Sequence, residues 1–95
     1  MELRELRSFC TAARVRSISR AAVILGIGQP TVTTHIKKLE TELDTILFDR
    51  MKRPIQLTVS GKALADLATP LVEGIDALAD TAIAAEKRGP VAVRA

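Results

Sequence analysis

A run of small polar and cationic side chains between Gly28 and Glu40 has the chemistry needed to contact DNA: Gly-Gln-Pro-Thr-Val-Thr-Thr-His-Ile-Lys-Lys-Leu-Glu. Pro30 has no amide hydrogen and a φ fixed near the helical value, so it is best placed in the first turn of a helix. Small polar groups near the positive end of a helix dipole suit close approach to phosphates and to base edges in a groove. We therefore interpret the run as a DNA recognition helix. Its polar side is predicted to carry Pro30, Thr34, Lys37, Lys38 and Thr41.

The apolar residues of this helix indicate how it is held. Val32, Ile36, Leu39 and Leu43 recur at intervals of three and four residues, which places them on the side opposite the polar residues. This apolar side must pack on other elements, and two helices are predicted before it. The first runs from Glu2 to Arg16 and has apolar residues at helical spacing: Leu3, Leu6, Phe9, Cys10 and Ala13.

A second, shorter helix is predicted from Arg20 to Leu25, with Ser19 as its N-cap. The adjacent small residues Ala21 and Ala22 allow another helix to approach closely, and Gly26 stands where a left-handed C-cap is expected. A short helix, a turn that contains glycine and a following helix with a polar outer side together make a helix-turn-helix motif. The candidate recognition helix is the second helix of that motif.

Two short β-prone runs, 46–50 and 55–58, follow the helix-turn-helix and predict a two-stranded ribbon. The proline between them makes a long central strand unfavourable but suits an edge ribbon. Arg50, Lys52 and Arg53 lie near its tip, and arginine is favoured where the minor groove is narrow and its potential most negative. The ribbon is thus predicted to be a minor-groove wing, with a solvated, charged hairpin as the alternative.

The second half of the chain is predicted to be one long helix, capped by Thr58 and ending near Lys87. About 29 helical residues extend about 43 Å, too far for the whole apolar side to be buried against the preceding domain. A stripe at coiled-coil spacing predicts instead that a second copy of the helix covers it and makes a dimer. Pro70 is expected to bend the helix without ending it, because the stripe continues in phase beyond it. The predicted dimer interface comprises Leu64, Leu67, Leu71, Ile75, Leu78 and Ala82.

Composition limits the class of protein. The chain has 95 residues, 47% of them apolar, with two phenylalanines and no other aromatic residue, which predicts one small, helix-rich domain. Scarce aromatic residues count against RNA and single-stranded ligands, whose bases stack on exposed rings. Residues 1–58 hold ten basic and six acidic residues, whereas residues 59–95 hold four and five. The positive charge therefore gathers around the candidate recognition helix.

Cys10 is the only cysteine, which excludes an internal disulfide and favours a reducing compartment; we expect the thiol to be buried. The chain starts without a signal-peptide block, and no run approaches the roughly 20 apolar residues of a membrane span. We therefore expect a cytoplasmic protein with no membrane partner. The sequence shows no metal-ligand cluster, no nucleophile with its base and no phosphate-cradling glycine loop, so we expect neither a metal site nor an enzyme.

Four stretches in this order resemble the DNA-binding domain of LysR-type transcriptional regulators. Leu6-Arg7-Ser8-Phe9 resembles the family's opening helix, and Ser17-Ile18-Ser19-Arg20-Ala21-Ala22 resembles its second helix. Residues 29–40, which end in Leu39-Glu40, resemble the recognition helix. Leu47-Phe48-Asp49-Arg50 and Leu57-Thr58-Val59-Ser60-Gly61 resemble the wing and the start of the linker helix. The resemblance covers residues 1 to about 88.

The resemblance implies a mostly α fold, with a winged helix-turn-helix of three helices and a two-stranded wing at 1–58 and a linker or dimerisation helix at 59–88. Residues 89–95 would be a hinge stub that leads to an absent domain, which in this family binds a small-molecule effector; no cofactor is expected in the fragment itself. Family members are bacterial regulators of transcription that bind an interrupted palindromic promoter site in double-stranded DNA. Their long helices pair into a homodimer, and full-length members tend to form tetramers.

Matching positions also imply roles for individual residues. Base contacts in the major groove would be made by Gln29, Pro30, Thr33 and Thr34. The residues that would reach the minor groove are Arg50 and Arg53. Phosphate contacts would be made by Ser19, Arg20, Thr31, Lys37 and Lys52.

Three positions depart from the family pattern: Gly28 stands where Ser is usual, Thr34 where Arg is frequent and His35 where Gln is common. A threonine cannot make the bidentate guanine contact that arginine makes, so the base preference at this position stays open. His35 falls on the flank of the helix, where we expect it to be packed or to face a phosphate, not to bind a metal.

Two alternatives remain open beside this interpretation. A helical dimerisation or adaptor module would explain the long apolar stripe, but it requires neither the basic ribbon nor the Gln29-Pro30-Thr31 helix start. Another family of winged-helix DNA-binding proteins is the second alternative.

Overall fold

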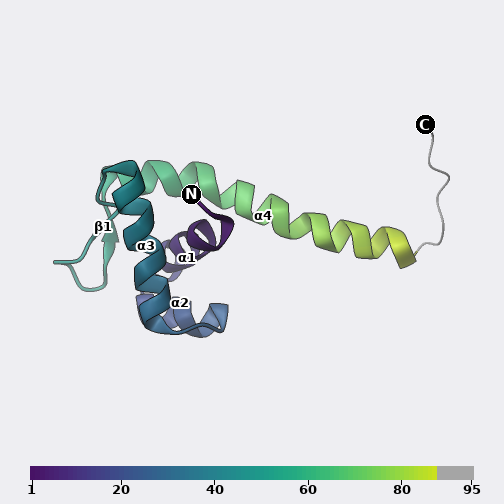
Figure 1. Cartoon of the computed structure of the whole chain (residues 1–95), viewed down its shortest axis with the longest axis horizontal. Coiled ribbons are helices and arrows are strands. Elements are labelled where there is room, and N and C mark those ends of the chain that lie inside the picture. The colour runs from purple at the N-terminus through teal and green to yellow at the C-terminus, as the bar shows by residue number, and fades with distance from the viewer. Residues whose placement is uncertain (88–95) are drawn as a thin grey trace.

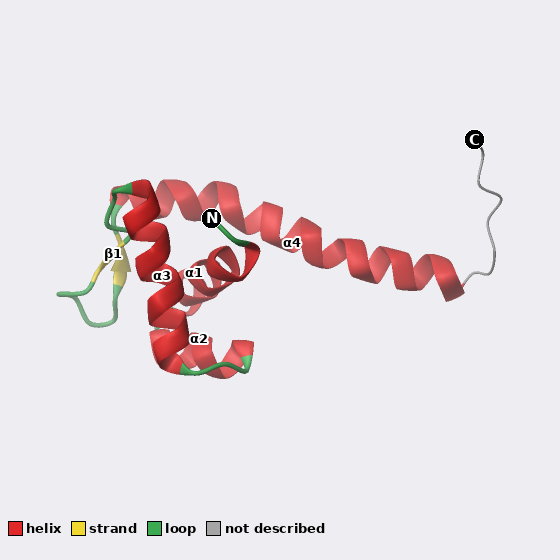
Figure 2. Ribbon diagram, in the orientation of Figure 1, coloured by secondary structure: helices red, strands yellow, loops and turns green. Residues whose placement is uncertain are grey.

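Four helices and a short two-stranded ribbon make up residues 1–87, the part of the chain that the computed structural model describes (Figure 1). The hinge stub predicted at 89–95 lies outside the described residues. The first three helices pack together with the ribbon beside them, while the last helix extends well beyond this group (Figure 2). The predicted winged helix-turn-helix with a long following helix is confirmed. The elements are α1 (Leu3–Val15), α2 (Ile18–Leu25), α3 (Gln29–Leu43), β1 (Phe48–Asp49), β2 (Gln56–Leu57) and α4 (Val59–Lys87).

The start of α2 lies two residues before the predicted one, and its N-cap is Ser17, not Ser19. The backbone of Ser17 is extended, at φ −160° and ψ 127°, and its Oγ accepts a hydrogen bond from the Arg20 amide at 3.1 Å. The physical reason is Ile18, which comes in helical phase with the two buried alanines of α2 and packs against the core. Including it in the helix removes one more apolar side chain from water.

The turn between α2 and α3 agrees with the prediction. Gly26 ends α2 in the left-handed conformation, at φ 68°, and its amide donates to the carbonyl oxygens of Ala22 and Val23. Gly28 is the N-cap of α3, and Pro30 lies in the first turn of that helix. The two helices of the motif are thus joined by three residues with the conformations that the sequence indicates.

The core is aliphatic except for one aromatic pair. Phe9 of α1 and Phe48 of β1 meet edge to face with their ring centroids 5.5 Å apart. Around this pair, the predicted apolar side of α3 is fully buried at Val32, Ile36 and Leu39. Leu43, predicted to belong to the same side, is 36% exposed because α3 ends there. The predicted burial of Cys10 is confirmed.

The ribbon is shorter than predicted. β1 and β2 hold two residues each and pair antiparallel, with Phe48 opposite Leu57 and Asp49 opposite Gln56. Just before β1, the amide of Leu47 donates to a side chain of α3 and not to a neighbouring strand. The residues between the strands form a loop whose proline has no amide to donate. The strand pairing is therefore confined to two residue pairs.

α4 is continuous over its 29 residues and passes through Pro70 without ending, as predicted. Thr58 caps it, because its Oγ1 accepts the Gly61 amide at 3.0 Å. Farther along, Asp76 forms an ion pair with Arg7 of α1. The long helix is thereby fastened to the domain near its start and again beyond its midpoint. Within residues 1–87 no helix combines the length and apolarity that crossing a membrane requires.

α4 has two apolar sides of different character. The side against the domain is formed by small residues, and the larger residues of the predicted stripe point outward. Leu64 is the exception in the stripe, since it is half-buried and packs against the core. Farther along the stripe, Leu67 is 73% and Leu71 67% exposed. The buried residues of α4 are Gly61, Ala65, Ala68 and Val72.

The substitution Gly61→Ala is predicted to destabilise the fold, because a Cβ there would lie 2.1 Å from the carbonyl oxygen of Leu47. We expect the free energy of unfolding to fall by about 1–3 kcal/mol, the usual effect of adding a methyl group to a filled site. Urea unfolding followed by circular dichroism measures this loss. Ser60→Ala, at the exposed neighbouring position, is the control and should change the value by less than about 0.5 kcal/mol. An unchanged Gly61→Ala would show that α4 does not depend on this close approach.

Candidate nucleic-acid interface

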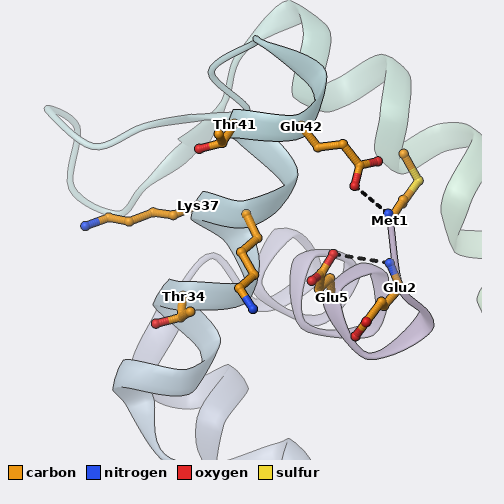
Figure 3. Close-up of a pocket in the computed structure, with 8 residues that line it drawn as sticks. Met1, Glu2, Glu5, Thr34, Lys37, Thr41 and Glu42 are labelled. Carbon is orange, nitrogen blue, oxygen red and sulfur yellow. Dashed lines mark hydrogen bonds and ion pairs between the residues drawn. The ribbon is translucent and has the colours of Figure 1, made fainter.

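α3 presents one polar side to solvent, and the burial of its other side fixes the rotation of the helix. Figure 3 shows Thr34, Lys37 and Thr41 projecting from α3 on the side away from α1. No rotation of α3 could turn these side chains inward without exposing the three residues that are fully buried. Among the predicted contact residues of this helix, Thr33 is half-buried, and the exposed ones are Gln29, Pro30, Thr31, Thr34 and Lys37.

The flank of α3 that faces α1 is occupied by contacts within the protein. The ring nitrogen Nδ1 of His35 and Oγ of the buried Ser8 are 2.7 Å apart, so His35 is packed, one of the two outcomes expected for it. Glu42 pairs with the amino group of Met1 (Figure 3). The hydrogen bond from this amino group to Glu42 raises the pKa of the Met1 amine. The side of α3 left for a partner is the one that carries Thr34 and Lys37.

Glu40 joins α3 to the wing, a role that sequence reasoning missed. Its side chain is only 8% exposed, and its Oε2 accepts the Leu47 amide at 2.7 Å. The two terminal nitrogens of Arg50 donate to the two carboxylate oxygens at 3.2 and 3.0 Å. Burial opposes ionisation, yet these hydrogen bonds outweigh it and hold the pKa of the Glu40 carboxyl below its usual value. The available signal was the position of Glu40, four residues after Ile36 on the apolar side, where an acid requires a partner.

The basic residues of the wing differ in their contacts. Arg50 lies against Glu40 and keeps 40% of its side chain exposed. Arg53 donates from Nη1 to the carbonyl oxygens of Arg50 and Lys52, at 2.6 and 3.1 Å. These bonds shape the loop and leave the positive charge of Arg53 without a carboxylate partner among the described residues. Lys52 is exposed at the tip.

Predicted contact residues from three elements surround one cleft. The cleft, of about 530 Å³, lies between the start of α2, the start of α3 and the wing. Ser19 and Gln29 line it from the helices, and Arg50 and Arg53 line it from the wing. Other predicted contacts lie elsewhere: Thr34 and Lys37 line a separate hollow between α3 and the start of α1. The wing loop extends beside α3 in Figure 1, so helix and wing can meet one elongated partner together.

A recognition helix with a buried apolar side, a supporting helix before it and a basic wing after it define a winged helix-turn-helix of the DNA-binding class. A family model described as "Bacterial regulatory helix-turn-helix protein, lysR family" matches residues 3–62. The chain therefore belongs to the LysR family and is a DNA-binding domain of a transcriptional regulator of that type.

Curated relatives bear the same description. HTH-type transcriptional regulator BudR of Klebsiella aerogenes is 45% identical over 83 residues, which are 87% of this chain and 55% of that protein. HTH-type transcriptional regulator CitR of Bacillus subtilis (strain 168) is 42% identical over 73 residues, 77% of this chain and 25% of that protein. The chain spans about half of the first relative and a quarter of the second. These relatives are transcriptional regulators, and the chain is not an enzyme.

Solved structures share the whole arrangement. The crystal structure of a BenM_DBD/catB site 1 DNA complex matches with a TM-score of 0.83 and 30% identity, over 97% of this chain and 100% of that chain. A CbnR_DBD-DNA complex matches with a TM-score of 0.76 and 32% identity, over 90% and 99%. Full-length BenM matches with a TM-score of 0.76 and 35% identity, over 84% and 26%. A similarity of this extent includes both the wing and the long helix.

The variant Glu40→Gln is predicted to loosen the wing, because an amide loses the charge that holds Arg50 and Leu47. We expect a loss of about 1.5–3 kcal/mol in the free energy of unfolding at neutral pH. The pKa of Glu40 is lower in the folded state, so its stabilisation is complete above the ordinary carboxyl pKa of about 4.3 and is lost as the pH falls through the folded value. Urea unfolding should therefore show a difference from wild type that shrinks below about pH 4.

The control for this pH series is Glu86→Gln, at an exposed acid near the far end of α4. It should follow wild type at every pH. A difference for Glu40→Gln that is as large in acid as at neutral pH would mean that the carboxylate charge does not hold the wing.

Proposed function

We propose that this chain binds double-stranded promoter DNA sequence-specifically, as one half of a symmetric homodimer on an interrupted palindrome. The observation that carries the proposal is the polar side of α3, held outward by a fully buried apolar side and placed beside a wing with Arg50 and Arg53. Such a helix fits the major groove, and arginines fit the adjacent minor groove. The likeness to BenM_DBD and CbnR_DBD, both crystallised with DNA, supports this proposal.

In the proposed complex the contact residues of the two helices and the wing divide by chemistry. The amide of Gln29 is able to bond to both N6 and N7 of adenine. Thr33 and Thr34 each offer a hydroxyl and a methyl group, which suits the exposed methyl of thymine, and Pro30 offers apolar contact alone. The remaining residues position the domain on the backbone without reading sequence. These phosphate contacts are Ser19, Arg20, Thr31, Lys37 and Lys52.

The outward stripe of α4 supports the dimer. Leu67, Leu71 and Leu78 are 73%, 67% and 67% exposed, a continuous apolar surface that marks an interaction site. The same stripe of a second copy could pack against this surface and bury it. The two-fold axis of such a pair would present two recognition helices to inverted half-sites. The proposed interface consists of Leu67, Leu71, Ile75, Leu78 and Ala82, together with Leu64, which is half-buried against the core of its own domain.

The proposal extends to a longer protein. Since the chain covers 25% of CitR and 26% of full-length BenM, we propose that it serves as the DNA-binding part of a longer cytoplasmic regulator. The other part would bind a small-molecule effector, and the full-length protein would assemble as a tetramer. The DNA-binding part itself would act without a cofactor.

The DNA proposal is tested with a labelled duplex selected by the protein from a random pool, titrated at several salt concentrations. Wild type should show a steep fall of log affinity with log salt, because each neutralised phosphate contributes about −0.9 to the slope. Gln29→Ala should weaken the selected duplex by about 1–3 kcal/mol and leave a random duplex nearly unchanged. Lys37→Ala should weaken both duplexes equally and reduce the slope by about 0.9 per subunit.

The matched control is Lys87→Ala, which removes the same charge at the far end of α4 and should bind as wild type does. A weak, salt-independent affinity of wild type would instead favour the dimerisation-module alternative. If Gln29→Ala lost the same factor on both duplexes, Gln29 would not read a base.

Leu71→Asp is predicted to separate the dimer, because it would place a charge in the middle of the proposed apolar interface. Sedimentation equilibrium should give the mass of a monomer for the variant and of a dimer for wild type. Val59→Asp adds the same charge at an α4 position outside the stripe that is 90% exposed, and it should remain a dimer. A dimeric Leu71→Asp would place the interface elsewhere.

A further inference from the structure

Arg16 adopts a backbone conformation that its residue type disfavours. The described residues contain three with positive φ: Gly26, Asp44 and Arg16, the last with φ 55° and ψ 37°. Glycine adopts this region without penalty, and aspartate visits it readily because its short side chain bonds locally. Arginine has neither property. A glycine at position 16 would end α1 with less strain, so the arginine side chain is the feature that needs an explanation.

Arg16 is exposed and lines a cationic cleft. The cleft lies between the start of α2, the start of α3 and the wing, and Arg50, Arg53 and Gln29 line it too. Arg16 also borders a smaller hollow toward Gln56 and Lys62. No acidic residue lines this cleft. The charge of Arg50 is matched by Glu40, whereas no hydrogen bond or ion pair within residues 1–87 engages the guanidinium of Arg16. The cleft therefore carries unmatched positive charge, from Arg16 and Arg53.

The geometry of duplex DNA identifies what would occupy this cleft. In the proposed complex, α3 enters the major groove and the wing enters the adjacent minor groove. Neighbouring grooves are separated by one sugar–phosphate strand, so the space between helix and wing must hold that strand. The cleft has Gln29 of α3 on one side and Arg53 of the wing on the other, with Arg16 joining them at the end of α1.

We propose that Arg16 contacts a phosphate of the DNA strand that passes between recognition helix and wing. This inference rests on the function proposed above and adds a contact from the C-cap of α1, a part of the fold that the other proposed contacts do not use. An arginine presents a planar set of donors that matches phosphate oxygens, which suits a position where the backbone is held but no base is read. The unfavourable conformation is then retained because it directs a cation into the path of the DNA.

The decisive variant is Arg16→Gly, because it removes the cation and relieves the backbone at the same time. Its Tm should be at or above that of wild type. Its affinity for the selected and the random duplex should fall by the same factor, roughly fivefold per subunit near 0.15 M salt, and the salt slope should decrease by about 0.9 per subunit. Arg16→Lys, which keeps the charge, should retain the wild-type slope.

Arg14→Ala is the matched control, since Arg14 is an exposed arginine in the last turn of α1 that lines the groove toward α4 instead. It should keep the wild-type affinity and slope. A folded Arg16→Gly with wild-type affinity and slope would overturn the proposal. If Arg16→Gly lowered the Tm, Arg16→Asn would repeat the comparison with another residue that tolerates positive φ, and a wild-type slope there would overturn it equally.

The failure of this inference is distinguishable from the failure of the proposed function. If the chain did not bind DNA, wild type itself would show no salt-dependent affinity for either duplex. If only the inference failed, wild type would bind as proposed and the Arg16 variants would match it.

Discussion

The arrangement of the DNA-binding surface depends on the hydrogen bonds that the carboxylate of Glu40 accepts. The carboxylate lies on the buried side of α3, yet its oxygens hold the Leu47 amide and the guanidinium of Arg50. A ribbon of two residue pairs is too small to be stable alone. The wing is therefore held by its neighbours: Glu40 ties it to α3, and the ring of Phe48 packs on Phe9 of α1. An acidic side chain of α3 thereby helps to hold a wing that is itself positively charged.

The same region also determines where α4 begins. The hydroxyl of Thr58 donates to the Ile46 carbonyl oxygen and accepts the Gly61 amide, so the residue that caps α4 is bonded to the segment before β1. The missing side chain of Gly61 lets the helix reach the Leu47 carbonyl. Leu47 is thus held by α3 through its amide and meets the first turn of α4 at its carbonyl. Recognition helix, wing and long helix are placed by one short stretch of chain.

Local patterns were enough to predict much of this structure, and long-range partners account for what they missed. The two sides of α3, the left-handed Gly26 and the passage of α4 through Pro70 follow from spacing and backbone chemistry. Ser17 and Ser19 are equally good caps, and only the packing of Ile18 decides between them. The inward side of α4 depends on close contact, which favours small residues over the larger stripe that periodicity makes conspicuous. The partner of Glu40 is ten residues away and could not be identified by spacing on a helix.

The ion pair between Arg7 and Asp76 has a mechanical consequence. Together with the buried residues Ala65, Ala68 and Val72, it holds α4 against the DNA-binding domain from the start of the helix to beyond its midpoint. In the proposed dimer, a change in the crossing angle of the paired α4 helices would move each winged helix-turn-helix through an arc. The length of that arc grows with the distance of the domain from the crossing point. The separation of half-sites that the dimer accepts would then depend on that angle. Any domain joined beyond Lys87 would be able to change the angle by moving the end of α4.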